Sequence, residues 1–153
     1  NGVCTNIKFI ECDITNIELL HQNLLDNEWN NTKPTILIME GIIYYLKEED
    51  LINIWKFFAP SNSSFACDFG ITPELIDEDN RIFGTEVFRK IKDSVGLNFV
   101  NFYDPDYFLK LLATAGYKLP VRYTMKDIQI ERTGSAEPFL SDNPEWITCV
   151  LKS

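Results

Sequence analysis

The segment Thr35-Ile36-Leu37-Ile38-Met39 is a nearly continuous apolar run, and Glu40-Gly41 follows it directly. A short run of this kind, rich in β-branched residues, is typical of a strand that is buried on both faces, as in a parallel sheet. Pro34 bounds the run on its other side. We therefore predict a strand over 35–39 that ends at an acidic residue.

Two further apolar runs flank this segment and have the same character. One lies over 7–12 and ends at Asp13, and the other lies over 64–69 and includes Asp68. Both are short enough to predict strands rather than helices. The chain thus offers three strands in succession.

The stretches between these runs have helical spacing. Thr15-Asn16-Ile17-Glu18 matches a capping box, which predicts a helix over about 16–27. Glu48-Glu49-Asp50 places acids in the first turn of a second helix, where the helix dipole favours them. Its apolar face consists of Leu51, Trp55 and Phe58.

The C-terminal half is expected to hold two more helices and two more strands. A helix is predicted over 80–93, and another begins at Asp104-Pro105 and ends at Gly116. The ranges 117–130 and 146–151 predict two final strands, which we expect to pair antiparallel. The buried face of the helix that begins at Asp104 is expected to consist of Tyr107, Phe108, Leu111, Leu112 and Ala115.

Strands that alternate with helices predict an α/β fold, a doubly wound sheet with right-handed crossovers and helices on both faces. The 153 residues suit one domain, and the net charge of −9 with scattered basic residues disfavours nucleic acid. We expect no membrane span and no signal peptide. The wide spacing of the cysteines suggests reduced thiols, so we expect a cytoplasmic protein.

The cysteine and histidine content bears on metal binding. Cys4, Cys12, Cys67 and Cys149 form no CxxC pair, and His21 is the only histidine. We therefore expect reduced thiols and no metal site. We interpret His21 as a surface helix residue rather than a catalytic base, and we expect Trp29, Trp55 and Trp146 to be packing residues.

Acidic residues stand at the end of each of the first three predicted strands: Asp13, Glu40 and Asp68. Ligands of open α/β sheets bind beyond the carboxyl ends of the strands. Carboxylates there accept hydrogen bonds from ribose hydroxyls or an exocyclic amine, and they attract a cation such as a sulfonium. The alternative is that each acid caps the following helix or stays solvated.

The segment Pro34-Thr35-Ile36-Leu37-Ile38-Met39-Glu40-Gly41-Ile42-Ile43-Tyr44-Tyr45-Leu46 resembles the P-T-L-x-I-x-E-G-x-x-x-Y-L signature of the leucine carboxyl methyltransferase family. Cys12-Asp13-Ile14 is similar to the family's A-D-L element, and Ala115-Gly116-Tyr117 to its A-G-F/Y element. The resemblance implies a class I methyltransferase fold, Rossmann-like, over roughly 7–151. It also implies S-adenosylmethionine as the cofactor.

The resemblance assigns roles to individual residues. Asp13 would take the adenine amine, and Ile14 the adenine ring. Glu40 would lie near the amino-acid and sulfonium end of the cofactor, where Gly41 allows close backbone approach. Tyr45 aligns with the family tyrosine, and Tyr44 stands where the family has an aliphatic residue. Both tyrosines are candidates for substrate binding, and packing is an equally good interpretation of Tyr45.

One family element has no counterpart here. The Gly-rich loop after the first strand of the family fold is absent, because the seven glycines form no GxG pair. The match begins at the third strand, so 1–153 is expected to be the C-terminal portion of a single methyltransferase domain. In the class I order, 3-2-1-4-5-7-6, strands 1 and 2 separate the strands expected at 7–12 and 35–39. An upstream N-terminal segment is therefore an expected partner.

The expected function is O-methyl transfer from S-adenosylmethionine to a carboxylate or hydroxyl of a small molecule or protein C-terminus. In-line displacement depends mainly on alignment, and a carboxylate acceptor needs no base. No catalytic residue is assigned. The alternatives are a non-catalytic methyltransferase-like domain that binds protein, and an unrelated nucleotide-binding α/β domain. The range 70–102 would carry substrate specificity.

Overall fold

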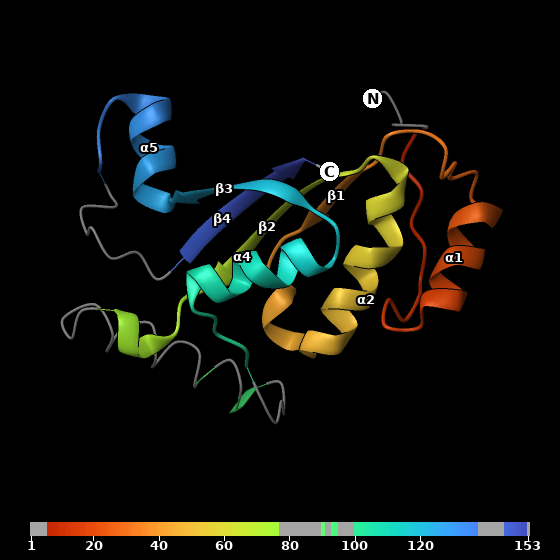
Figure 1. Ribbon diagram of the computed structural model, residues 1–153, viewed down its shortest axis with the longest axis horizontal. Coiled ribbons are helices and arrows are strands. Elements are labelled where there is room, and N and C mark those ends of the chain that lie inside the picture. The colour runs from red at the N-terminus through yellow and green to blue at the C-terminus, as the bar shows by residue number, and fades with distance from the viewer. Residues whose placement is uncertain (1–5, 77–89, 91–92, 95–99, 138–145, 153) are drawn as a thin grey trace.

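The computed structural model describes residues 6–76, 90, 93–94, 100–137 and 146–152. Figure 1 shows a sheet with helices packed along it. The helices named in the figure are α1 (Ile17–Asp26), α2 (Glu48–Phe58), α4 (Pro105–Thr114) and α5 (Met125–Thr133). The strands are β1 (Ile36–Met39), β2 (Ser64–Gly70), β3 (Lys118–Thr124) and β4 (Trp146–Lys152). The predicted helix over 80–93 lies outside the described residues, apart from positions 90 and 93.

The sheet has the order β1-β2-β4-β3. β1 and β2 pair parallel, with Ile38 opposite Ala66. β4 lies between β2 and β3 and pairs antiparallel with both of them. The protein is therefore a mixed α/β fold with a small parallel pair at one side, and the carboxyl ends of β1 and β2 lie next to each other.

The helices α2 and α4 pack on one face of this sheet, and α1 packs against α2 (Figure 1). The expectation of helices on both faces of the sheet is not met in the described part of the chain. The chain steps along the sheet in one direction from β1 to β2 and on to β3. Right-handed crossovers that advance in one direction place their helices on the same face, which accounts for the difference.

A cluster of aromatic rings forms the core between the sheet and the two helices. Trp55 of α2 and Phe108 of α4 are both 0% exposed, and their ring centroids are 5.5 Å apart. Phe108 stacks on Phe69 of β2 at 4.0 Å, and Trp55 contacts Phe65 edge-on at 5.6 Å. The apolar face predicted for α2 is therefore the face that packs on the sheet. Trp29 is partly buried against the same core.

The caps of two helices follow the sequence pattern with one change. The side chain of Asp104 accepts a hydrogen bond from the Tyr107 backbone N–H at 2.9 Å and so caps α4, which begins at Pro105 as predicted. At α1 the capping residue is Asn16, which accepts from the Leu19 N–H at 3.1 Å, and not Thr15. Thr15 lies one residue before the cap, where its N–H and hydroxyl both donate to Asp13.

The range 7–12 is not a strand, which corrects the prediction made from its apolar run. A strand needs a hydrogen-bonded neighbour, and β1 lies at the edge of the sheet with β2 as its only strand partner among the described residues. Ile7 and Phe9 are 58% and 96% exposed. The apolar residues that suggested a strand thus lie uncovered.

The predicted strand over 117–130 is also too long. β3 ends at Thr124, and Met125–Thr133 form α5. The side chain of Thr124 accepts from the Asp127 N–H at 3.0 Å, and Asp127 accepts from the Thr124 N–H at 2.9 Å. This capping box favours a helix where apolar alternation suggested a strand, and Gly134 ends the helix with φ 74°.

Tyr107 departs from the buried face predicted for α4, because it is 45% exposed. Its hydroxyl donates to the Glu48 carboxylate, with both oxygens at 3.0 Å, so the side chain bridges the N-terminal turns of α4 and α2. The other four residues expected in this face, Phe108, Leu111, Leu112 and Ala115, are buried.

The buried phenol of Tyr103 predicts a loss of stability in alkali. Burial, with the Glu48 carboxylate as a second cause, raises the pKa of Tyr103 to about 12. An unfolded tyrosine has a pKa of about 10, so above that pH the unfolded chain loses a proton that the folded chain retains. The stabilisation is therefore complete below pH ~10 and is lost as the pH rises toward ~12.

We expect the urea concentration at the midpoint of unfolding to fall as the pH is raised from about 9 to about 11. It should fall less in Tyr103→Phe. The comparison of the two proteins isolates Tyr103 from other groups that titrate in alkali. Equal falls in both proteins would show that Tyr103 does not carry the effect.

Candidate functional site

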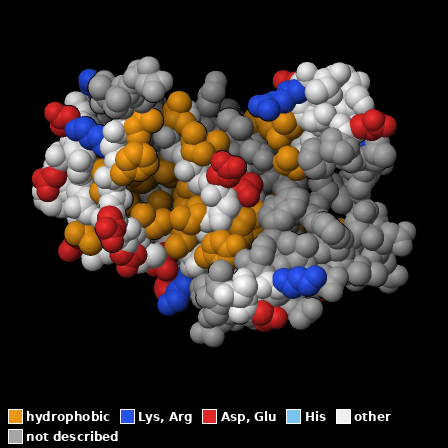
Figure 2. Space-filling model, turned by 180° about the vertical axis from the view of Figure 1, so that it is seen from behind, with side chains coloured by type: hydrophobic (Ala, Val, Ile, Leu, Met, Phe, Trp, Pro, Cys, Tyr) orange, Lys and Arg blue, Asp and Glu red, His pale blue; other side chains and the backbone are white. Residues whose placement is uncertain are grey.

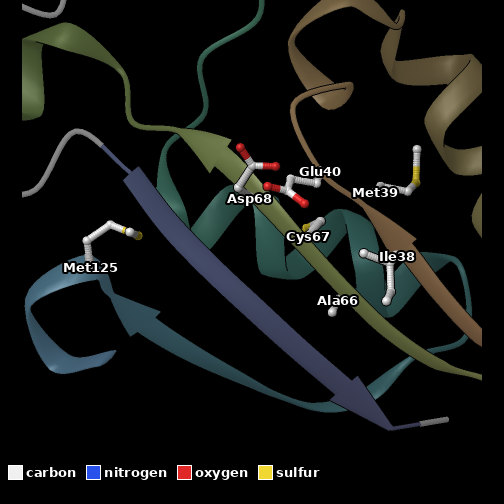
Figure 3. A pocket seen from close by; sticks show the side chains of 7 residues that line it. All are labelled: Ile38, Met39, Glu40, Ala66, Cys67, Asp68 and Met125. Carbon is white, nitrogen blue, oxygen red and sulfur yellow. The ribbon is translucent and has the colours of Figure 1, made fainter. Parts of the chain in front are cut away.

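The carboxyl ends of β1 and β2 border a pocket of about 330 Å³ on the face of the sheet that α2 and α4 do not cover. Figure 3 shows the carboxylates of Glu40 and Asp68 at one side of this space. Met125, at the start of α5, lines the other side. The remaining lining residues come from the two strands and are Ile38, Met39, Ala66 and Cys67.

Glu40 is exposed and follows β1 directly. In β1, Met39 is 4% exposed and points to the core, whereas Ile38 is 68% exposed and points to the opposite face. Side chains alternate along a strand, so the sequence places Glu40 on the same face as Ile38. Glu40 therefore offers a carboxylate to the pocket and not to the core.

Asp68 holds the turn that follows Glu40. Its Oδ1 accepts a hydrogen bond from the Gly41 N–H at 2.7 Å, and its Oδ2 accepts from the Tyr44 hydroxyl at 3.2 Å. Gly41 has φ 66°, in the left-handed region that glycine adopts without strain. Apart from its chain neighbours, no described residue would lie within 4 Å of a Cβ added there. Glycine is thus needed for its backbone conformation and not for space.

Tyr44 is 2% exposed and is packed from several sides. Gly70 lies so close that an added Cβ would meet Tyr44 Cε1 at 3.0 Å and Phe102 Cδ1 at 2.7 Å. The Tyr44 carbonyl also accepts from the Asn101 N–H at 2.9 Å. Burial, and then the negative charge of Asp68, raise the pKa of Tyr44 far above its usual range. The phenol therefore stays protonated and remains a donor to Asp68.

Tyr45 differs from its neighbour because it is only partly buried. Its ring contacts that of Tyr44 edge-on, with centroids 6.1 Å apart. The two tyrosines named from the sequence therefore have unlike surroundings. Tyr44 supports the turn from inside, whereas Tyr45 retains surface that a bound molecule can reach.

Asp13 and Ile14 lie before α1 and do not line the pocket. The Oδ1 of Asp13 accepts from the Thr15 N–H at 3.0 Å and from the Thr15 hydroxyl at 2.8 Å. These hydrogen bonds lower the pKa of Asp13, so the group is a carboxylate. Asp13 therefore shapes the entry to α1 and is itself exposed, while Ile14 packs in part against the core.

The structure thus brings together Glu40, Gly41, Tyr44 and Asp68, and it places Asp13 and Ile14 apart from the pocket. The sequence marks Asp68 as an acid at a strand end, but no local pattern links it to Gly41. No sequence pattern marks Met125 as a site residue, because it lies in an apolar stretch that resembles a strand. The capping box of α5 is the available clue, because it locates Met125 at the start of a helix.

His21 packs in part between α1 and α2, with ring centroids 5.3 Å from Phe57 and 6.4 Å from Trp29. It does not line the pocket. Neither Cys12 nor Cys67 forms a disulfide. Within the described ranges, no helix is long and apolar enough to cross a membrane.

Exposed apolar side chains lie on β1, which borders the site, and on β3. Ile36 and Ile38 of β1 are 73% and 68% exposed, and Val121 of β3 is 47% exposed. Figure 2 shows hydrophobic side chains gathered on one side of the molecule, with acidic side chains among them. The pocket is therefore bordered by apolar surface that no described helix covers.

The N-terminal part of the chain is similar to a known protein family. Residues 2–59 match the model of the leucine carboxyl methyltransferase family. This range includes Asp13, Ile14, Glu40, Gly41, Tyr44 and Tyr45. No curated protein matches the chain.

A solved structure is similar in fold: a possible exported protein from Bordetella parapertussis, with a TM-score of 0.51 and 10% sequence identity. The similarity covers 77% of this chain and 38% of the Bordetella chain. At this identity the likeness concerns the fold alone. The chain is therefore similar to leucine carboxyl methyltransferases over residues 2–59, and it spans well under half the length of its structural neighbour.

Proposed function

We propose that this chain is the C-terminal part of an S-adenosylmethionine-dependent O-methyltransferase. The observation that carries the proposal is the position of Glu40. It lies at the carboxyl end of β1, in a pocket, and within the segment that matches the leucine carboxyl methyltransferase model. The carboxyl ends of parallel strands are where open α/β sheets bind their ligands.

The strand order supports the proposal. The class I sheet ends in the order 4-5-7-6, so its last strand in sequence lies inside the sheet and not at its edge. The order here is β1-β2-β4-β3, and the last strand, β4, likewise lies inside, antiparallel to both of its neighbours. β1 then corresponds to strand 4, so Glu40 follows the strand that bears the family's E-G element.

The residues at the pocket suit a cationic ligand with an apolar body. Glu40 supplies a carboxylate, and Ile38, Ala66 and Met125 supply apolar surface. S-adenosylmethionine combines a sulfonium, an amino group and apolar carbons, and when bound it supplies the methyl group. Glu40 would hold the amino-acid and sulfonium end beside Gly41, and Asp13 and Ile14, which do not line this pocket, would hold the adenine.

The acceptor is proposed to be a carboxylate or hydroxyl of a small molecule or a protein C-terminus. The pocket is lined by no histidine or lysine among the described residues. A carboxylate acceptor suits such a site, because its oxygen attacks without losing a proton. The chain would then act by aligning the acceptor oxygen with the methyl group and by excluding water. Tyr45 would contact the substrate. We propose a cytoplasmic location for this reaction.

An upstream segment of the same protein is the proposed partner. β1 presents an edge with no strand beside it among the described residues, and Ile36, Ile38 and Phe9 are highly exposed. A strand inserted between the 7–12 segment and β1 would pair this edge. The same segment would supply the Gly-rich loop that this chain lacks.

The test is a calorimetric titration of S-adenosylhomocysteine into the 153-residue chain and into a chain extended upstream. We expect weak or no binding to the first and clear binding to the second. Absence of binding to both would overturn the proposal. It would favour the alternative, a non-catalytic domain that binds protein through the exposed apolar surface.

A further inference from the structure

We propose that Asp68 is a positioning residue: it fixes the turn at Gly41 so that the Glu40 carboxylate faces the pocket. This inference rests on the proposed function and adds a residue that lies outside the family match, which ends at residue 59. Asp68 is contributed by β2, whereas the turn that it holds follows β1.

Asp68 accepts two hydrogen bonds. One carboxylate oxygen binds the Gly41 N–H at 2.7 Å and the other binds the Tyr44 hydroxyl at 3.2 Å. The Gly41 N–H belongs to the planar peptide unit that joins Glu40 to Gly41, so its hydrogen bond to Asp68 restrains the Glu40 ψ angle and with it the direction of the Glu40 side chain. A glycine in the left-handed region has many other conformations available, and the bond to Asp68 selects one of them.

Tyr44 in turn fixes Asp68. The tyrosine is 2% exposed and lies against Gly70 and Phe102, so its hydroxyl has a set position. Its protonated state makes it a permanent donor to the carboxylate. A buried side chain thus anchors Asp68, and Asp68 anchors an exposed turn. The parallel pairing of β1 with β2, in which Met39 lies opposite Cys67, brings the two strand ends together.

Two substitutions of Asp68 distinguish a role in positioning the turn from a direct attraction between its carboxylate and a cationic ligand. In Asp68→Asn the amide oxygen still accepts from the Gly41 N–H, and the amide NH₂ donates to the Tyr44 hydroxyl, which is also an acceptor. The shape of the network is retained and the charge is lost. Asp68→Ala removes both hydrogen bonds and the charge.

The experiment measures the dissociation constant of S-adenosylhomocysteine by calorimetry in the upstream-extended chain. We expect Asp68→Ala to weaken binding about 10- to 100-fold, as misplaced groups do in preorganised sites, and Asp68→Asn to weaken it by less than about threefold. Equal losses in both variants would overturn the inference, because the charge of Asp68 would then act directly. No loss in either variant would overturn it as well.

A matched pair of tyrosine variants controls for general destabilisation. Tyr44→Phe removes the hydroxyl that binds Asp68, and Tyr117→Phe removes a buried hydroxyl that lies 3.0 Å from Ser63 Oγ, outside the pocket. We expect Tyr44→Phe to weaken binding about threefold and Tyr117→Phe to leave it unchanged. Equal effects of the two variants on binding would mean that Asp68 has only a structural role.

A second readout needs no ligand. Amide hydrogen exchange at Gly41 is expected to be about tenfold faster in Asp68→Ala than in the parent chain or Asp68→Asn. If the parent chain does not bind S-adenosylhomocysteine but this pattern of exchange appears, the proposed function fails and the positioning of the turn stands. If Gly41 exchanges equally in all three proteins, the positioning role fails.

Discussion

Phe108→Ala is expected to lower the free energy of unfolding by about 3–5 kcal/mol, the usual cost of truncating a buried aromatic residue. Phe108 is 0% exposed and joins α4 to the rest of the core. It stacks on Phe69 at 4.0 Å and meets Trp55 and Tyr103 edge-on at 5.5 Å and 5.1 Å. Truncation leaves a cavity between these three rings. Because the rings are held by different parts of the chain, they cannot all move in to fill it. Urea unfolding followed by fluorescence measures the loss.

Phe9→Ala is the matched control, because it makes the same chemical change at a side chain that is 96% exposed. Its cost should stay within about 0.5 kcal/mol in the chain described here. A similar loss of stability in both variants would contradict the core as described. In the upstream-extended chain, Phe9→Ala should become more costly if the added segment covers this side chain.

Glu40→Gln is expected to weaken the binding of S-adenosylhomocysteine to the upstream-extended chain by about 10- to 100-fold. Glutamine keeps the size and one oxygen acceptor but loses the charge. A hydrogen bond to a charged group contributes about 1.5–3 kcal/mol, which corresponds to this range. Glu40 is exposed and outside the core, so the variant should unfold at the same urea concentration as the parent. Calorimetry measures the affinity.

Glu49→Gln provides the charge-matched control, since Glu49 lies in the first turn of α2 and does not line the pocket. It should leave the affinity unchanged. Equal losses for Glu40→Gln and Glu49→Gln would indicate a general effect of net charge. Unchanged binding by Glu40→Gln would place the ligand away from β1 and would contradict the site proposed here.

The parts of the fold with a strong local signal could be predicted from the sequence. The strand predicted over 35–39 is β1, Ile36–Met39, the stripe Leu51, Trp55 and Phe58 is buried, and α4 begins at Pro105. The range 7–12 failed because a strand depends on a neighbour, and no local pattern reports whether one is present. The range 125–130 failed because the Thr124–Asp127 capping box outweighed its apolar residues.

The candidate site could be predicted only in part, for a related reason. The sequence identifies acids at strand ends, and the pocket contains Glu40 and Asp68. It does not indicate that a carboxylate from β2 binds the Gly41 N–H, because that contact joins residues 27 positions apart. It also does not show that Tyr44 is buried while the adjacent Tyr45 is not, since their place in a 3-10 helix sets which ring points inward.

The place of β4 in the sheet has a consequence for biosynthesis. β4 is the last of the described strands to leave the ribosome, yet it lies between β2 and β3 and pairs with β2 along seven residues, Ser64 to Gly70. Until it emerges, β2 and β3 have no strand between them, and the sheet cannot form as one unit. Its assembly must follow translation of this region, and the nascent chain meanwhile exposes strand edges that chaperones recognise.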